Sequence, residues 1–142
     1  MRMKFYEFFV NYPDNADYNL YIVWDKKQCL YVGISLRNVW NRWFDWGGHL
    51  NINEYGEIKG NSDIGRVIEK NNPKSLNFDV ELLEIDGYKW QVEKKERCFI
   101  KELKPLFNTT HREPYTDDEL KLYKYYSNPY LELSFEKPHE RS

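Results

Sequence analysis

The sequence lacks several features that would each assign it to a class. Its two cysteines, Cys29 and Cys98, have no CxxC spacing and are too few for a disulfide framework. No run of about 18 apolar residues is present, so we expect no membrane-spanning segment. The N-terminus has no long apolar stretch with a small-residue cleavage site, as a secretory signal would. We therefore expect a cytoplasmic chain, in a reducing compartment and without a membrane partner.

Charge of one sign is also scarce. The chain carries 21 Lys and Arg against 23 Asp and Glu, a formal net charge of −2. Affinity for nucleic acid rests mainly on Lys and Arg contacts to phosphates, so the overall composition does not predict a polyanion partner. The basic segment is 89–112, with seven Lys and Arg against three Asp and Glu. That segment is either the solvated face of a helix or a local phosphate-binding stripe.

Several well-known catalytic motifs are missing. The sequence has no Gly-rich phosphate loop, no HExxH and no Cys/His zinc spacing. Aromatic residues, by contrast, make up 18% of the chain. With 142 residues, the chain is long enough to bury a core of its own, and we expect residues 1–142 to form one domain.

Hydrophobic periodicity and turn signals predict an α+β chain in the order strand, strand, helix, helix, strand, helix, with additions at both ends. Two β-rich runs separated by DKKQ predict a hairpin, and Gly47 and Gly48 are expected to end the helix that follows it. A Thr-x-x-Glu capping box predicts a helix near the C-terminus. The predicted strands are 4–10, 19–25, 29–35, 78–85 and 130–135, the predicted helices are 38–46, 63–71, 88–103 and 117–126, and 50–62 is expected to be a loop.

Glu96 is the most informative polar residue of the 88–103 helix. It lies four residues from both Val92 and Ile100, in the middle of the apolar stripe, whereas Glu93 falls off that stripe. A carboxylate that faces inward is unfavourable unless it is paired, hydrogen-bonded or bound to a metal ion. Glu96 is therefore a candidate metal ligand, and a salt bridge at the edge of the core is the structural alternative.

Arg42 stands among aromatic residues on the 38–46 helix. Val39, Trp43 and Trp46 predict its inward face, and Arg42 flanks that face. An arginine in such a place can stack on a ring and present its guanidinium group to an anion. It can also simply pack its aliphatic stem.

The predicted hairpin carries Tyr21 and Tyr31. If the two residues pair directly, both rings leave the same face of the sheet, whereas a slip of one residue puts them on opposite faces. The sequence does not choose between a three- and a four-residue loop at DKKQ, so the register stays open.

Taken in order, these segments resemble the GIY-YIG nuclease family. Residues 19–21 (NLY) and 31–33 (YVG) are similar to the two signatures of the family. Arg42 follows on the next helix, and 96–108 (ERCFIKELKPLFN) resembles the acidic helix of the family in its Glu, Ile, Pro and Asn. The resemblance covers about residues 18–110.

The resemblance implies a small antiparallel three-stranded sheet flanked by helices, with 111–142 as a C-terminal helical extension. It implies an endonuclease that acts on DNA with one Mg²⁺ or Mn²⁺ ion, held by Glu96; a hard ion that keeps most of its waters needs few protein ligands. Tyr21 and Tyr31 would orient or deprotonate the attacking water. Arg42 would bind the scissile phosphate, and Asn108 would support the site.

Further candidate residues follow from the same resemblance. His49, seven residues after Arg42, is a candidate general base or phosphate contact. Arg37 competes with Arg42 for the phosphate, because the spacing before Arg42 is one residue longer than the family leads us to expect. Lys94 and Lys101, on the basic segment, are further candidate contacts to DNA.

Two other functions stay open. Asn19 stands where the family usually has Gly, and the near-neutral charge is unusual for a nuclease that holds long DNA unaided. Both features favour a catalytically inactive module that binds nucleic acid or protein on the same fold. An unrelated interaction protein would instead bury Glu96 in an ion pair with an arginine. The tyrosine-rich helix after Thr116 could dock a partner protein or form a homodimer, or pack onto its own core.

Overall fold

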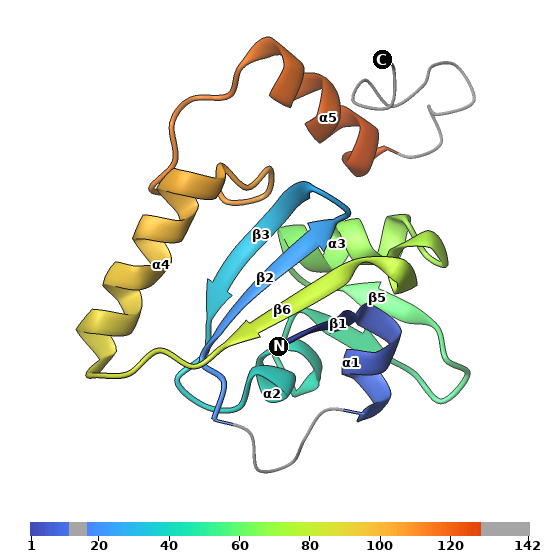
Figure 1. Ribbon diagram of the computed structural model, residues 1–142. Helices are drawn as coiled ribbons and strands as arrows, with labels where there is room; N and C mark the ends of the chain where they lie inside the picture. Colours follow the sequence, from blue (N-terminus) through green and yellow to red (C-terminus); the bar gives the residue numbers. More distant parts are fainter. Residues whose placement is uncertain (12–16, 129–142) are drawn as a thin grey trace.

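The computed structural model describes residues 1–11 and 17–128, and over these ranges the fold is α+β (Figure 1). Strands and helices are interspersed along the chain, and the β2–β3 hairpin predicted from the sequence is present. The strands are β1 (Arg2–Lys4), β2 (Leu20–Asp25), β3 (Gln28–Ile34), β4 (Leu50–Ile52), β5 (Ile58–Gly60) and β6 (Asp79–Leu83). The helices are α1 (Phe5–Asn11), α2 (Val39–Phe44), α3 (Asp63–Lys70), α4 (Lys89–Leu103) and α5 (Asp117–Ser127), with a 3₁₀ turn η1 (Lys74–Asn77).

The main sheet is antiparallel and has four strands in the order β1-β6-β2-β3, where three were expected. The additional strand is β1, which pairs with β6 at the edge. A separate two-stranded sheet joins β4 and β5. None of the described helices is both long and apolar enough to cross a membrane.

The N-terminal segment corrects the prediction of a strand over 4–10. Only Arg2–Lys4 is extended, and the chain turns helical at Phe5. Phe5 and Phe8 are one helical turn apart, and both rings pack against Trp43, with centroids 5.5 and 6.1 Å away. The β-rich composition of the segment is overridden because only a helix brings both rings onto this contact.

The segment 50–62 also differs from its prediction, because it contains the β4–β5 hairpin rather than loop alone. The Asn53 side chain fixes the turn by accepting hydrogen bonds from the backbone N–H groups of Tyr55 and Glu57, each at 2.9 Å. Gly60 at the end of β5 lies against α3 and donates its N–H to the Glu69 carboxylate at 2.7 Å. The hairpin begins directly after His49 and so anchors the backbone on one side of that residue.

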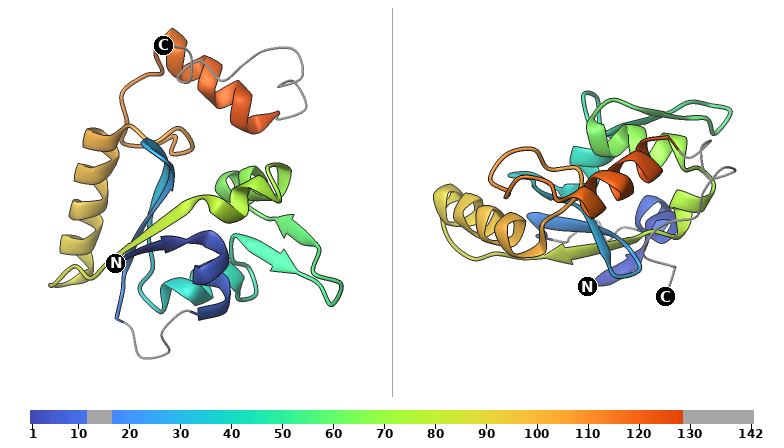
Figure 2. Two further views of the ribbon diagram at one scale, coloured as in Figure 1. Left: turned by 45° about the vertical axis from the view of Figure 1, so that its right-hand side comes forward. Right: turned by 90° about the horizontal axis from the view of Figure 1, so that it is seen from above.

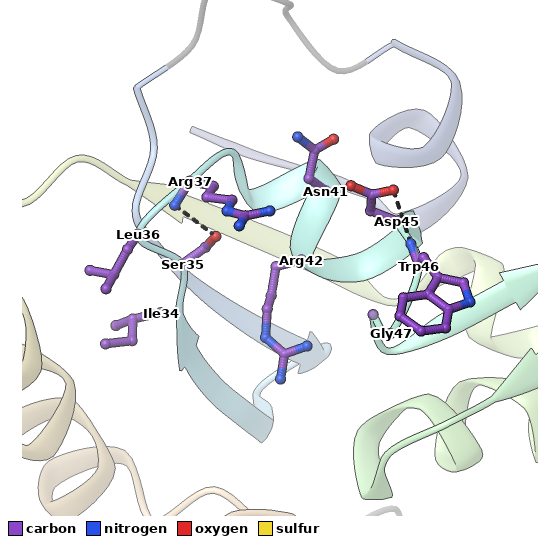
Figure 3. Close-up of a pocket in the computed structure, with 10 residues that line it drawn as sticks. Ile34, Ser35, Leu36, Arg37, Asn41, Arg42, Asp45, Trp46 and Gly47 are labelled. Atoms are coloured by element: carbon purple, nitrogen blue, oxygen red, sulfur yellow. Dashed lines mark hydrogen bonds between the residues drawn. The ribbon is translucent and has the colours of Figure 1, made fainter.

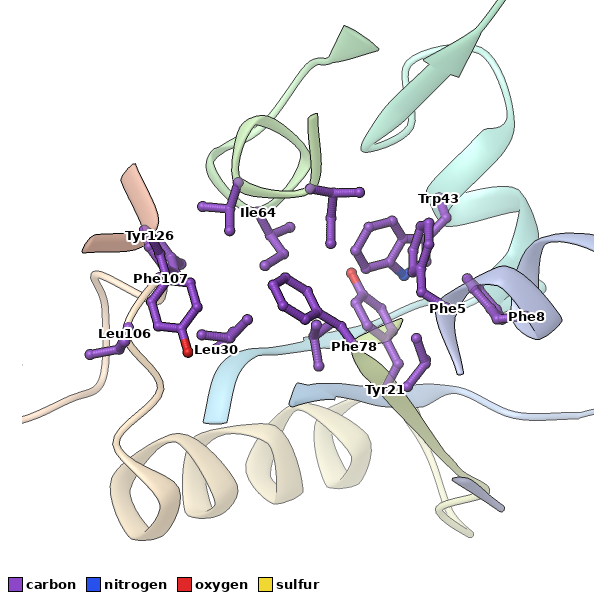
Figure 4. Packing of buried hydrophobic residues seen from close by; sticks show 14 of the residues in the cluster. Phe5, Phe8, Tyr21, Leu30, Trp43, Ile64, Phe78, Leu106, Phe107 and Tyr126 are labelled. Carbon is purple, nitrogen blue, oxygen red and sulfur yellow. The ribbon is translucent and has the colours of Figure 1, made fainter. Parts of the chain in front are cut away.

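The two faces of the main sheet bury different helices. One face contributes Leu20, Ile22 and Val32 to a small cluster with Ile100 of α4. The other face contributes Tyr21, Val23 and Leu30 to the larger core shown in Figure 4. Helices α1, α2, α3 and α5 cover this second face. Alternation along β2 therefore separates the α4 side of the sheet from the aromatic side.

The C-terminal half follows the sequence closely. Helix α5 begins with the predicted capping box, in which Thr116 and Glu119 accept each other's backbone N–H groups. Leu122 and Tyr126 of α5 are buried in the chain's own core. The segment between α4 and α5 lies against β3, where the Phe107 N–H donates to the Leu30 carbonyl at 2.9 Å (Figure 2). The strand predicted over 130–135 lies outside the described residues.

Candidate active site

The hairpin register decides where the two tyrosines point. Tyr21 pairs with Gly33, and Tyr31 pairs with Val23, so the direct Tyr21–Tyr31 pairing does not occur. The loop is the two-residue Lys26–Lys27 turn, shorter than either loop considered, with Lys26 at φ +54°. The tyrosines are offset by two residues, so both rings still leave the same face, with centroids 6.1 Å apart.

Gly33 makes room for the Tyr21 ring. A Cβ atom at position 33 would lie 2.4 Å from both Cζ and Oη of Tyr21, far inside van der Waals contact. The glycine of the YVG segment therefore has a specific steric reason in this chain. It lets the Tyr21 side chain lie flat across the neighbouring strand.

A chain of buried polar groups holds the Tyr21 hydroxyl. Its Oη atom lies 2.6 Å from Nε2 of His49, and Nδ1 of His49 lies 2.6 Å from Oγ of Ser62. Ser62 caps the N-terminus of α3 by accepting the Gly65 N–H at 3.2 Å. The Tyr21 and His49 residues are each only 1% exposed. The hydroxyl is thus fixed by residues from a loop and a helix cap that follow much later in the chain.

The His49 ring is neutral near pH 7. Burial, aided by the nearby Arg42 charge, lowers its pKa to about 3. A neutral imidazole has one donor and one acceptor nitrogen, and here Tyr21 and Ser62 engage both. The expected roles of general base or phosphate contact would need an exposed nitrogen, and this structure gives His49 none.

Arg42 and Glu96 act on the same two tyrosines. Burial raises the pKa of Tyr21 well above its ordinary value, and it also raises the pKa of Tyr31. The Arg42 charge lowers the pKa of both hydroxyls, and the Glu96 charge raises the pKa of both. Because such effects weaken with distance, Arg42 on α2 and Glu96 on α4 both lie within electrostatic range of the two hydroxyls.

Glu96 lies between the buried residues Val92 and Ile100, as the helical spacing predicts, and is itself half-buried. Burial and the neighbouring Glu93 charge raise its pKa, against the opposing effect of Arg97. Among the described residues, Glu96 has no hydrogen-bond or ion-pair partner. The buried Glu–Arg pair expected of an unrelated interaction protein is therefore not formed in this part of the chain.

The donor set near Glu96 fits one hydrated hard ion. Within 1–11 and 17–128, no group of three or more His, Cys, Asp and Glu side chains is gathered closely enough to hold a metal ion. Mg²⁺ commonly binds through one or two carboxylates and keeps several waters. The carboxylate of Glu96, with Glu93 one turn before it, meets that requirement.

Arg42 is exposed on α2 and has no side-chain partner among the described residues. It lines a cavity of about 350 Å³ together with Arg37, Ser35 and Trp46 (Figure 3). The placement of Trp46 corrects the prediction of an inward face. Helix α2 ends at Phe44, so Trp46 belongs to the following turn and is 98% exposed.

Two asparagine side chains brace the signature strands. The Asn108 amide accepts the Val32 N–H at 2.9 Å and donates to the Val32 carbonyl at 2.8 Å. Asn19 makes the same pair of bonds to Ile85, at 2.8 and 2.9 Å. Asn108 thus supports the YVG strand directly and makes no hydrogen bond to the Glu96 carboxylate within the described structure.

The structure does not bring every candidate residue to this place. Lys94 and Lys101 are exposed on α4, and their positions along the helix put them on a different side from Glu96. Arg37, by contrast, shares the cavity with Arg42. Sequence reasoning did not find Ser62, whose only local signal is its position before a predicted helix.

Comparison with known proteins adds no relative to these observations. No protein-family model matches the chain, and neither a curated protein nor a solved structure matches it. The function is therefore inferred from the residues and their geometry.

Proposed function

We propose that this chain is a metal-dependent endonuclease that hydrolyses phosphodiester bonds in DNA. The observation that carries the proposal is the convergence of two tyrosines, an unpartnered arginine and an unpartnered glutamate from four separate elements. A guanidinium group binds the oxygens of a phosphate, and a carboxylate binds a hard divalent ion. The resemblance of residues 18–110 to GIY-YIG nucleases supports the same function.

Arg42 is the proposed phosphate ligand. Its guanidinium group is exposed and satisfied by no described side chain, so it is available to an anion. A guanidinium binds two phosphate oxygens at once and so stabilises the charge that develops during hydrolysis. Arg37, on the same cavity, would contact an adjacent phosphate.

Tyr31 is the better candidate to orient or deprotonate the attacking water. Its ring is half-buried, whereas Tyr21 is enclosed and held by His49. The two rings pack side by side, with centroids 6.1 Å apart. Tyr21 is therefore the proposed positioning residue, which holds its ring against the ring of Tyr31.

His49 and Ser62 extend this support. If Ser62 donates to Nδ1 of His49, the Nε2–H of His49 donates to the Tyr21 oxygen. Both donors in this chain then point toward the Tyr21 hydroxyl. Such an alignment strengthens the hydrogen bond that holds this hydroxyl, because hydrogen bonds in a chain polarise one another.

Glu96 is the proposed ligand of one Mg²⁺ or Mn²⁺ ion, with Glu93 near enough to contribute through water. The bound ion would supply charge stabilisation and a more acidic water. Burial and the neighbouring Glu93 charge raise the pKa of Glu96, and a bound cation would stabilise its charged form.

A plasmid-nicking assay tests the proposal. Supercoiled DNA is incubated with Mg²⁺ or Mn²⁺ and wild type, Glu96→Gln or Glu102→Gln, the last being a matched control at an exposed carboxylate of the same helix. We expect EDTA and Glu96→Gln each to lower cleavage at least about 100-fold and Glu102→Gln to leave it unchanged. Cleavage that survives Glu96→Gln would contradict this site.

The second candidate is a catalytically inactive binding module. The near-neutral charge of the chain still favours it. Asn19 no longer does, because its amide is explained by the two hydrogen bonds that it makes to the Ile85 backbone. Failure of the wild type to cut double-stranded, single-stranded and branched DNA would favour this module.

A further inference from the structure

Trp46 is exposed on a turn that the backbone holds in place. The residue is 98% exposed within the described structure, more than any other large hydrophobic residue there. Asp45 accepts the Trp46 N–H at 2.9 Å, and the Gly48 N–H returns to the Asp45 carbonyl at 2.8 Å. Gly47 has a φ of +79°, a left-handed backbone conformation that glycine adopts readily and residues with a side chain rarely adopt. The turn thus presents a large apolar ring to solvent on a defined backbone.

The indole stands beside the proposed phosphate ligand. Trp46 and Arg42 line one cavity, and both side chains project to the same side of α2 in Figure 3. Arg37 adds a second guanidinium group to the lining, and Leu36 adds a second exposed apolar side chain. The cavity therefore combines two cationic groups with an aromatic face. A nucleotide carries groups that complement both, an anionic phosphate and a flat base.

We propose that this cavity binds an unpaired nucleotide of a DNA strand, with its base stacked on Trp46 and its phosphate on Arg42. The proposal rests on the nuclease function, because it places the scissile strand at Arg42. It assigns the substrate class as DNA with at least one unstacked nucleotide, such as a single strand, a flap or a frayed end.

The charge of the chain favours this substrate over intact duplex. Binding to duplex depends largely on phosphate contacts, and the chain has a net charge of −2. Stacking on an aromatic side chain needs no basic surplus and accepts every base. A base inside a duplex already stacks on both faces and is not available to Trp46.

Binding measurements in EDTA separate this inference from catalysis. Fluorescence anisotropy is recorded with a labelled single-stranded 12-mer of DNA and with the same sequence as duplex. Wild type is compared with Trp46→Ala, with Trp46→Phe, which keeps a ring, and with Trp90→Ala, a control at another exposed tryptophan, on α4. Thermal unfolding of each variant checks that the fold is intact.

We expect Trp46→Ala to weaken single-strand binding roughly 5- to 150-fold, the range that the loss of one stacked base produces. Trp46→Phe should bind within a few fold of wild type, and Trp90→Ala should match it. Quenching of tryptophan fluorescence by the single strand should be smaller in Trp46→Ala than in wild type.

Equal binding by Trp46→Ala and wild type, or a preference of wild type for duplex, would overturn the inference. The two proposals fail separately. A wild type that nicks DNA but binds independently of Trp46 refutes only the stacking site. A wild type that binds through Trp46 but cuts nothing refutes only the nuclease.

Discussion

The buried pair of the candidate site, Tyr21 and His49, differs from the charged pair, Arg42 and Glu96, in where its partners come from. Both polar groups of the buried pair are hydrogen-bonded within the chain. The groups of the charged pair have no side-chain partner among the described residues. Folding therefore completes the buried pair, whereas under the proposed function a phosphate and a metal ion would complete the charged pair.

This difference separates the expected effects of substitution. Removing a group with no partner in the free protein changes little in the folded state, so it should affect activity alone. Removing a group from the buried pair leaves a polar atom unsatisfied or a ring displaced, so it should affect stability as well. Three substitutions test this division, in order of decreasing effect.

Arg42→Ala should lower the cleavage rate about 100- to 1,000-fold, because it removes the group that stabilises charge on the phosphate. Arg42→Lys should stay impaired, since lysine does not reproduce bidentate contact. The free energy of unfolding, measured in urea, should change by less than about 0.5 kcal/mol. Arg66→Ala, at an exposed arginine of α3 that pairs with Asp63, is the control for the cleavage rate. A large loss of stability in Arg42→Ala would break the comparison.

His49 should make the stability of the protein depend on pH. Its folded pKa of about 3 lies below the unfolded value of about 6.5. Between these two pH values the unfolded state binds a proton at His49 and the folded state does not. Stability is complete above about pH 6.5 and falls as the pH drops toward 3, by at most about 1.4 kcal/mol per pH unit. Between pH 6.5 and 4 the loss approaches about 3 kcal/mol.

The check is urea unfolding of wild type and His49→Gln across this pH range. The variant should show a flatter profile, and groups common to both proteins cancel in the difference. His111→Asn serves as control, because His111 is exposed and Asn tolerates its positive φ. Parallel profiles for wild type and His49→Gln would mean that His49 does not titrate as a buried neutral group.

Gly33→Ala should destabilise the fold by about 1–3 kcal/mol, because the new methyl group overlaps the buried Tyr21 ring. In a Tyr21→Ala background the same change should have a much smaller effect, since the space is then empty. The coupling energy from this double-mutant cycle measures the contact directly. An equal effect of Gly33→Ala in both backgrounds would assign the strain to some other contact.

How much of the fold was predictable depends on the range of the interactions. The α4 position of Glu96 and the capping box at Thr116 were predicted correctly, because both depend on residues three or four apart. The strand predicted over 4–10 was wrong, because Phe5 packs against Trp43, and this distant contact outweighs the strand preference of the neighbouring residues. The β4–β5 hairpin was missed because its strands are three residues long and only partly apolar.

By itself, the sequence determined the features that depend on short spacings, such as the position of Glu96 on α4 and the start of α5 after Thr116. Spacing along a helix or strand is a property of the chain alone, and it already placed Glu96 among apolar residues. The tertiary structure alone decided that Tyr21 lies opposite Gly33 and that Trp46 faces solvent. It also decided that Tyr21 bonds to His49, which follows 28 residues later in the chain. These outcomes depend on a two-residue hairpin loop, on the end of α2 at Phe44, and on packing between distant segments. Local periodicity carries no information on such distances, because the contacts form only when separate elements pack against one another.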